Sequence, residues 1–424
     1  MRRAFIAVFF LALQAPLAGQ TLSDHFRDLF TFGNCGDPLC LTVGTTFNHG
    51  SHFIPSATQG EKNMLAFVTG SIATSLGNLP FTAASSGITF SFVDGAPVAT
   101  SVSPGPIFAE RSQTLGRGRL VAGLNVNGVS MDNLRGVPLS DLTFRFAHVN
   151  VGQPALGDPA FERDIIEVST DIKLSLLVTS VFASYGLLSN VDVGVLVPIV
   201  RASIDGSSDA QIVTSLAQTP HLFDQATPST QATASSSGSA IGVGDVAIRA
   251  KINVRQTQSW GAALIADVRL PTGDADNFLG SGNTSVRALA VISASAGKFA
   301  PHANVGFAFR TGDNQNKSIL ATVGFDQLLS SKVSLAAELI TDLEVGESRL
   351  TLPEPVIFTA PDPTPVTLSL SDIPDRKDNL VDASFGFKFS LTSDFRAISN
   401  VLVPLSEGGI RPKFLWTVGL ERTF

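Results

Sequence analysis

Hydrophobic and polar residues alternate along much of the chain with a period of two. In DVAIRAKINVR (residues 245–255), Ile248 and Ile252 fall on one side, and Arg249 and Lys251 fall on the other. Side chains of a β-strand point alternately to its two faces, so this pattern predicts a strand with an apolar face and an ionic face. The same division recurs at 260–270, 302–310, 318–326, 332–342 and 380–389. We therefore expect an all-β protein.

The length of these segments distinguishes a membrane barrel from a sandwich in water. Strands of about ten residues, tilted near 45°, reach across the apolar layer of a bilayer. A Lys or Arg facing lipid at mid-membrane costs roughly 2–4 kcal/mol, whereas a watery interior accepts charges of either sign. The charges of these segments all fall on one face. This predicts an antiparallel transmembrane β-barrel of the bacterial outer membrane.

The connections between the segments alternate in length. Short connections lie at 256–259, 295–301, 328–332 and 391–394, and mostly longer ones, rich in Gly, Ser, Thr, Pro and Asp, lie at 202–243, 271–283, 346–378 and 406–411. Outer-membrane barrels have short periplasmic turns and longer extracellular loops. The sequence thus predicts which end of the barrel faces the periplasm.

The number of strands follows from counting back from the C-terminus. Thirteen candidate strands lie between residues 116 and 424, among them 140–150, and GITFSFV (87–93) is the natural fourteenth. Bacterial single-chain barrels have even strand numbers. We expect fourteen strands, with twelve as the alternative if an early strand is misread.

Both ends of the chain carry signals for export. Arg2 and Arg3 precede an apolar run and then small residues, which is typical of a signal peptide at 1–19. The last strand alternates and ends on Phe424, which resembles the C-terminal signal read by the machinery that assembles outer-membrane barrels. Residues 20–85 lack clean alternation, and we expect there a segment that plugs the lumen, with a short helix in LSDHFRDLF (22–30). Residues 86–424 then form the barrel.

Composition narrows the class further. Hydrophobic residues make up 44% and charged residues 15% of the chain, where soluble globular proteins average about 25% charged residues. The net charge is −7 and there is no long basic tract, so nucleic acid is not an expected partner. Beyond the signal peptide, no uncharged apolar run of 18 residues predicts a membrane-spanning helix.

Candidate chemistry is sparse. Cys35 and Cys40 are the only cysteines, and export to an oxidising compartment favours a disulfide between them. A zinc site would need His49 and His52 as further ligands, and we favour the disulfide. No GxSxG motif marks a nucleophile, so we expect no enzyme, and nothing in the sequence requires a cofactor or a metal.

Parity of the strands predicts a set of charged residues that line the lumen. These are Arg249, Lys251, Asp267, Arg269, Arg287, Arg310, Asp326, Glu338, Asp342, Asp382 and Lys388. One interpretation is a transverse field that selects solutes. The other, which we favour, is that ion pairs between these side chains fill and stiffen the barrel. A single β-bulge would invert the assignment within a strand.

Four segments together resemble a known family. They are ERSQTLGRGRL (110–120), VFASYGLLSNVDVGVLVPIVR (181–201), GVGDVAIRAKINV (242–254) and RLPTGDADNFLGSG (269–282). They are similar to outer-membrane proteins of the MetA pathway of phenol degradation family, relatives of the long-chain fatty-acid and aromatic-hydrocarbon transporters. The resemblance runs from about residue 108 onward. It implies a channel for small hydrophobic or aromatic compounds, and a plugging N-terminal segment as in the fatty-acid transporters.

The expected function is thus passive uptake of small hydrophobic or aromatic solutes across the outer membrane of a Gram-negative bacterium. Two alternatives stay open: a general porin for polar solutes, and a structural or surface-binding barrel that transports nothing. A channel for hydrophobic compounds predicts an apolar pocket and a segment inside the lumen. A porin predicts an open, wet pore, and a structural barrel predicts neither. The expected partners are the lipid bilayer, the solute and, during biogenesis, the assembly machinery.

Overall fold

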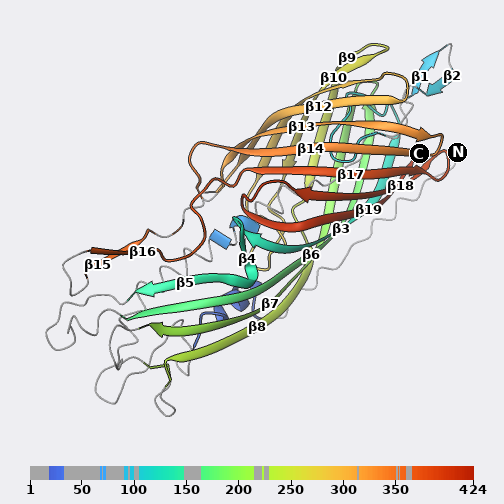
Figure 1. Ribbon diagram of the computed structural model, residues 1–424. Helices are drawn as coiled ribbons and strands as arrows, with labels where there is room; N and C mark the ends of the chain where they lie inside the picture. The colour runs from blue at the N-terminus through green and yellow to red at the C-terminus, as the bar shows by residue number, and fades with distance from the viewer. Residues whose placement is uncertain are drawn as a thin grey trace.

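Twelve of the described strands close into an antiparallel barrel (Figure 1). They are β3 (Leu120–Leu134), β6 (Ile165–Leu188), β7 (Val191–Val213), β9 (Ala247–Gln256), β10 (Trp260–Arg269), β11 (Ser285–Ala294), β12 (Phe299–Arg310), β13 (Lys317–Ser330), β14 (Val333–Val345), β17 (Leu380–Ser390), β18 (Phe395–Pro404) and β19 (Ile410–Thr423). The computed structural model describes residues 19–32, 67–68, 70–72, 90–93, 96–99, 105–147, 164–213, 222–223, 229–312, 315–349, 352, 354–359 and 365–424.

The barrel closes where its first strand meets its last strand. Strand β3 pairs with β19 on one side and with residues 174–185 of β6 on the other. The remaining strands pair with their neighbours in the chain, except that β7 pairs with β9 and β14 pairs with β17. Every pairing in the wall is antiparallel, so the predicted fold class is confirmed.

The predicted number of fourteen strands is wrong, and the alternative of twelve is correct. Residues 140–150 yield β5 (Leu142–Ala147), which pairs only with residues 165–170 of β6. Residues 87–93 yield β1 (Phe90–Val93), which pairs with β2 (Ala96–Ala99) in a separate hairpin. Strand β6 has 24 residues, more than twice the length needed to span a bilayer. Its long edge therefore serves both β3 and β5, and β5 adds nothing to the wall.

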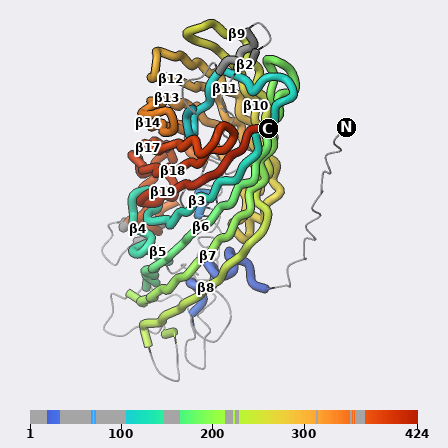
Figure 2. Tube along the Cα trace, turned by 90° about the vertical axis from the view of Figure 1, so that its right-hand side faces the viewer, coloured from blue at the N-terminus to red at the C-terminus, as the bar shows by residue number. Residues whose placement is uncertain are grey.

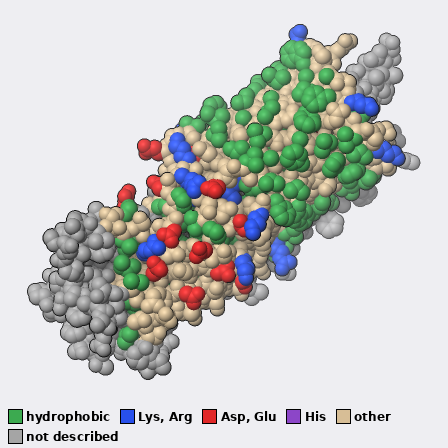
Figure 3. All heavy atoms as spheres, in the orientation of Figure 1, with side chains coloured by type: hydrophobic (Ala, Val, Ile, Leu, Met, Phe, Trp, Pro, Cys, Tyr) green, Lys and Arg blue, Asp and Glu red, His purple; other side chains and the backbone are tan. Residues whose placement is uncertain are grey.

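Alternation sorts the side chains of the wall into an outer and an inner set. Along β9, Ile248 and Ile252 are exposed on the outside, while the Lys251 side chain is buried inside. Along β12, Val305 and Phe307 are exposed in the same way. Apolar side chains cover the part of the barrel that carries the C-terminus (Figure 3). A closed sheet with an apolar outside is the arrangement that a bilayer requires, because the strands of the wall pair with one another and leave no open sheet edge in the lipid. The protein is an outer-membrane barrel, as the sequence predicts.

The outer faces of β6 and β7 mark where the apolar band ends. Leu177 and Val181 are exposed apolar residues of β6, whereas the outward Lys173 and Ser175 are polar. On β7 the change falls before Arg201, which lies opposite Leu177. Residues 165–176 of β6 and 201–213 of β7, which we call the upper halves of these strands, therefore lie outside the membrane. They are at the end opposite the short turns, which is the extracellular end.

A sheet of four strands projects from this end of the barrel (Figures 1 and 2). It consists of β5, the upper halves of β6 and β7, and β8 (Gln231–Val243), which pairs with residues 199–211 of β7. The β3–β4 hairpin, with β4 at Val137–Pro138, and a 3₁₀ turn at Leu139–Asp141 connect it to β3. A further two-stranded hairpin, β15 (Val356–Thr359) with β16 (Pro365–Leu368), belongs to the connection between β14 and β17.

The N-terminal helix covers the inner face of the projecting sheet. Helix α1 (Leu22–Asp28) confirms the helix predicted at 22–30. Its spacing puts Leu22, Phe26 and Leu29 on one side, and all three are buried in the largest apolar cluster of the described chain. The cluster continues along the inward side chains of β6 and β7. Among the described residues, no helix is long and apolar enough to cross a bilayer.

Candidate functional site

A non-helical segment, residues 105–118, runs through the barrel lumen before β3 begins. We call it the inner segment. It contacts wall strands on several sides of the barrel: β14 and β13 through Glu338 and Asp326, β11 through Ser293, β9 through Arg249, and β7 through Asp192. The lumen is therefore not an open pore at this level.

Glu338 anchors the upper part of the inner segment. Its carboxylate accepts hydrogen bonds from three consecutive backbone N–H groups, those of Ile107 (3.0 Å), Phe108 (2.9 Å) and Ala109 (3.1 Å). Successive N–H groups that converge on one anion form a nest, and a carboxylate inside it gains charge-assisted hydrogen bonds. Gly386 permits the close approach, because a Cβ there would lie 2.3 Å from Ile107 Cδ1. The wall and the inner segment are thus in close contact, through hydrogen bonds at Glu338 and through packing of Ile107 against Gly386.

Two charged side chains of the inner segment pair with charges of the wall. Glu110 forms ion pairs with Arg249 and with Lys251, whose Nζ lies 3.3 Å away. Arg111 pairs with Asp326 at 2.5 Å, and both side chains are almost entirely buried. Removing one partner from such a buried pair leaves an uncompensated charge, which costs about 3–5 kcal/mol. These pairs fix the segment in the lumen.

The predicted lumen residues form networks rather than a free charged lining. Asp267 lies among three arginines, with Arg249 at 3.0 Å, Arg287 at 2.9 Å and Arg269 at 3.9 Å. Register explains this group, because Arg249 and Arg287 lie opposite Asp267 on the two neighbouring strands. Opposite charges at facing positions of adjacent strands attract each other.

The other predicted residues also lie on the inner side of the wall. Arg310 pairs with Asp342 at 2.7 Å. Asp382 pairs with Arg411, which the sequence pattern did not single out. Lys388 is buried at 1% exposure. The structure therefore brings most of the predicted residues together in ion pairs, which is the arrangement expected if they stiffen the barrel.

A cavity lies between the inner segment and one side of the wall. Its empty volume is about 800 Å³, a figure that includes space open to solvent. Its lining mixes apolar side chains with charged ones: Phe108, Leu289, Leu320, Ile340 and Leu380 on the one hand, and Glu110, Arg249, Arg287, Asp342 and Asp382 on the other. We call it the lumen cavity.

A second, wholly apolar cavity lies at the extracellular mouth, under α1. Its empty volume is about 320 Å³, a figure that includes space open to solvent. Its lining comes from α1, the projecting sheet, β19 and three connections: Phe26, Val68, Ile72, Leu139, Leu142, Ile172, Leu174, Ile204, Phe278 and Ile410. We call it the mouth cavity. Phe278 turns its buried ring into this cavity from a backbone with φ 56°, a conformation that is strained for an aromatic residue.

Helix α1 covers the mouth cavity and is not part of the barrel wall. Beyond its apolar contacts, α1 is held by a few hydrogen bonds, including Ser23 N to the carbonyl of Asp276 (2.9 Å) and Leu22 N to Asn277 Oδ1 (3.2 Å). His25 contacts Ser236 of β8 through Nδ1 at 2.8 Å. Because α1 is not a strand of the wall, it could move without breaking the barrel.

Some predictions fall on residues at the edges of the structure. Cys35 and Cys40 lie outside the described residues, as do His49, His52 and most of the segment 20–85. Phe424 is exposed at the barrel seam, where its N–H donates to the carbonyl of Leu120 at 2.7 Å. Its role as an assembly signal stays a prediction.

Sequence reasoning missed the residues that fill the lumen from within. Glu110 and Arg111 stand in a segment without periodicity. Their adjacent opposite charges, in a stretch (95–116) that is otherwise uncharged, were the available signal. His302 begins the alternating segment 302–310, next to a short connection, yet it lies inside β12 and is buried, 3.5 Å from Glu338 and 3.8 Å from Asp326. The strand begins three residues earlier than its alternation suggests.

The sequence of residues 169–345 matches the family model described as "Putative MetA-pathway of phenol degradation". This confirms the resemblance over that range, which contains three of the four segments quoted for it. The match does not reach the inner segment. No curated protein sequence matches the chain.

Several solved structures resemble the chain in part. A COG4313 outer membrane channel from Pseudomonas putida F1 has 15% identity and a TM-score of 0.45, covering 74% of this chain and 98% of the other. The CymD monoaromatic hydrocarbon channel has 8% identity and a TM-score of 0.33, with coverages of 73% and 89%. A Pseudomonas aeruginosa FadL homologue has 11% identity and a TM-score of 0.34, with coverages of 72% and 90%.

Proposed function

We propose that this barrel is a passive channel that takes up small hydrophobic or aromatic compounds across the outer membrane. The observation that carries the proposal is the mouth cavity, whose lining is apolar throughout. A lining without polar groups offers no hydrogen bonds to water or to a polar solute, and it therefore favours apolar compounds. A porin for polar solutes would instead present a wet opening at this position. The proposal includes no catalytic step.

The lumen cavity supports the same function from below. Its apolar side chains, among them Leu320 and Ile340, lie opposite Phe108 of the inner segment. The ion pairs of the inner segment gather on Glu110 and Arg111, so the charges there are already neutralised by partners. A solute without charge therefore passes between the inner segment and the wall at lower cost than an ion, once the segment shifts.

Conductance in planar bilayers separates the channel from a porin. Because the inner segment crosses the lumen and the apolar cluster under α1 fills the extracellular mouth, we expect purified protein to give small or rare conductance steps. A general porin gives large, stable steps. Large steps from the wild-type protein would favour the polar-solute alternative, which the charged part of the lumen cavity otherwise supports.

Uptake of a labelled monoaromatic hydrocarbon into cells tests the substrate class. We expect faster uptake in cells that carry the gene than in cells that lack it. Ile172→Asn places an amide in the mouth cavity and should lower that uptake about tenfold, because an unpaired buried amide costs about 1–3 kcal/mol. Asp171→Asn, next in sequence but on the outer face of β6, is the matched control and should leave uptake unchanged. Equal uptake with and without the gene would sink the proposal.

A further inference from the structure

Arg135 occupies an unusual position at the extracellular end. It stands at the tip of the β3–β4 hairpin with φ 50°, and its side chain is fully buried. Its N–H donates to the carbonyl of Gly409, in the connection between β18 and β19, at 2.8 Å. A strained backbone and a buried guanidinium persist only where the surroundings demand them.

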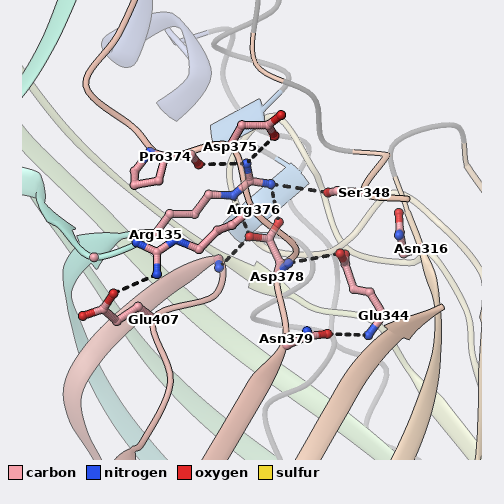
Figure 4. A network of polar contacts seen from close by, with 12 residues as sticks. Arg135, Asn316, Glu344, Ser348, Pro374, Asp375, Arg376, Asp378, Asn379 and Glu407 are labelled. Atoms are coloured by element: carbon pink, nitrogen blue, oxygen red, sulfur yellow. Dashed lines mark hydrogen bonds and ion pairs between the residues drawn. The ribbon is translucent and has the colours of Figure 1, made fainter. Parts of the chain in front are cut away.

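The guanidinium makes a two-pronged ion pair with Asp378 (Figure 4). Arg135 Nε lies 2.7 Å from Asp378 Oδ1, and Nη2 lies 3.0 Å from Oδ2. The same Oδ1 accepts the N–H of Gly409 at 2.7 Å, and the N–H of Asp378 donates to Glu344 at 3.0 Å. Asp378 belongs to the connection between β14 and β17, so the pair joins three separate pieces of the extracellular end.

The remaining contacts of Arg135 extend the junction. Nη1 donates to the carbonyl of Pro374 at 3.3 Å, and Nη2 donates to Ser348 at 3.4 Å. The guanidinium carbon lies 4.6 Å from the centre of the Phe67 ring, which comes from the N-terminal part of the chain. Planar stacking and forked hydrogen bonds at one site are geometry that lysine cannot reproduce.

These contacts lie next to the mouth cavity. Val68 follows Phe67, Ile410 follows Gly409, and Leu139 lies four residues beyond Arg135, and all three line that cavity. Ile373, five residues before Asp378, is buried in the apolar cluster that surrounds this cavity, so a movement of Asp378 away from Arg135 would disturb that cluster.

We propose that the Arg135–Asp378 pair is a latch that holds the described residues 370–378 of the connection between β14 and β17 against the extracellular end of the barrel, and that releasing it opens the barrel to the outside. The latch concerns closure and does not depend on which solute passes. Loss of Asp378 leaves the buried guanidinium with one more distant carboxylate, the exposed Asp375 at 3.8 Å, and loss of Arg135 removes the main counter-charge of the buried Asp378. Displacement of the connection rehydrates the charge that remains. Replacing both partners by apolar residues leaves no buried charge, and so removes the tendency of the connection to move away in order to hydrate one.

The same surface offers a matched control. Arg376 pairs with Glu407 at 2.8 Å between the same two connections, but both side chains are exposed, at 39% and 62%. An exposed pair of this kind contributes little to stability. Glu407→Gln should therefore leave the mouth closed while it removes an ion pair from the same place.

The test uses the full-length protein in intact cells and in planar bilayers. The connection carries Arg349, Arg376 and Lys377 as trypsin sites, and cleavage there reports its release. We expect Arg135→Met and Asp378→Asn to be cleaved about tenfold faster than the wild type, since opening of a local unit follows its free energy. We expect both to raise the open-channel conductance.

The double variant Arg135→Met with Asp378→Leu leaves no buried charge and should be cleaved more slowly, and conduct less, than either single variant. The Glu407→Gln variant should behave as the wild type does in both measurements. Resistance of the barrel to SDS before heating verifies folding in every variant, and Asp378→Asn carries the test should Arg135→Met not assemble. Wild-type cleavage in the single variants, faster cleavage without a rise in conductance, or a double variant as open as the single ones would each overturn the latch.

Discussion

Glu338 shows how single residues decide whether the lumen is filled. A glutamate at this position of β14 is one of many inward polar residues by sequence, yet its two oxygens satisfy three N–H groups of the inner segment. Those N–H groups lie in a segment without secondary structure of its own, and they are the groups that would otherwise be buried without partners. The wall thus supplies what the inner segment lacks.

Glu338→Gln should loosen the inner segment. The amide keeps the size of the side chain but removes the charge and one acceptor oxygen, and hydrogen bonds to a charged group contribute about 1.5–3 kcal/mol. We expect the amides of Ile107, Phe108 and Ala109 to exchange with solvent at least about tenfold faster. Thr341→Val, in the same strand but without a hydrogen bond to the segment, is the control. Unchanged exchange at all three amides would contradict the anchor.

Parity could place side chains on a face of the wall, but it could not supply their partners. Arg249 and Lys251 share a face by alternation alone, and their side chains lie on the inner side of β9. Their partner Glu110 lies 139 residues earlier than Arg249, in a stretch where no period exists to read. Contacts of that kind depend on the closed barrel, so the sequence pattern could not reveal them.

At the scale of elements, contact with the membrane determines which strands can be predicted from the alternation of hydrophobic and polar residues. Strands β9, β10 and β12 stand out in the sequence because their outer residues face lipid. Strand β8 (QATASSSGSAIGV) and the upper half of β7 were interpreted as a long loop. Their outer faces meet water and carry Ser, Thr and Asp, so the contrast between the two faces is weak. The same cause led to the wrong strand number, since β5 also lies beyond the apolar band.

The cap of α1 is the next prediction. Thr21 accepts the N–H of Asp24 at 3.1 Å, and Asp24 in turn accepts the N–H of Thr21 at 2.9 Å. Loss of such a cap costs about 0.5–2 kcal/mol of helix stability. Thr21→Ala should therefore expose Arg27 in α1 to trypsin more often, while Thr21→Ser, which keeps the hydroxyl, should not. Equal cleavage of the two variants would show that apolar packing alone holds α1.

The same cap predicts a dependence on pH. The N–H and then the hydroxyl of Thr21 lower the pKa of Asp24 below its ordinary value of 3.8. A lowered pKa in the folded state contributes stability that is present above the ordinary value and is lost as the pH falls through the lowered one. Cleavage at Arg27 by an acid-tolerant protease should therefore rise as the pH falls below about 4 in the wild type. In Asp24→Asn this rise should be absent.

At the scale of the whole molecule, the position of the bilayer follows from the outer surface. Val305, near the middle of β12, is 55% exposed on the outside. Val305→Arg should lower the free energy of unfolding in liposomes by roughly 2–4 kcal/mol, the cost of a basic side chain at mid-membrane. Ser207→Arg, on the outer face of β7 beyond the apolar band, should change it little. Equal effects of the two substitutions would place the bilayer elsewhere.

The unequal length of the strands gives the rim of the barrel two heights. Strands β9, β10 and β11 have ten residues each, while β6 has 24 and β7 has 23. The wall formed by β9, β10 and β11 thus ends close to the surface of the bilayer, whereas the wall formed by β6 and β7 extends well beyond it. We therefore expect a molecule that diffuses within the outer leaflet to reach the extracellular opening more readily over the short strands than across the long ones. Access to the opening has a direction in the plane of the membrane.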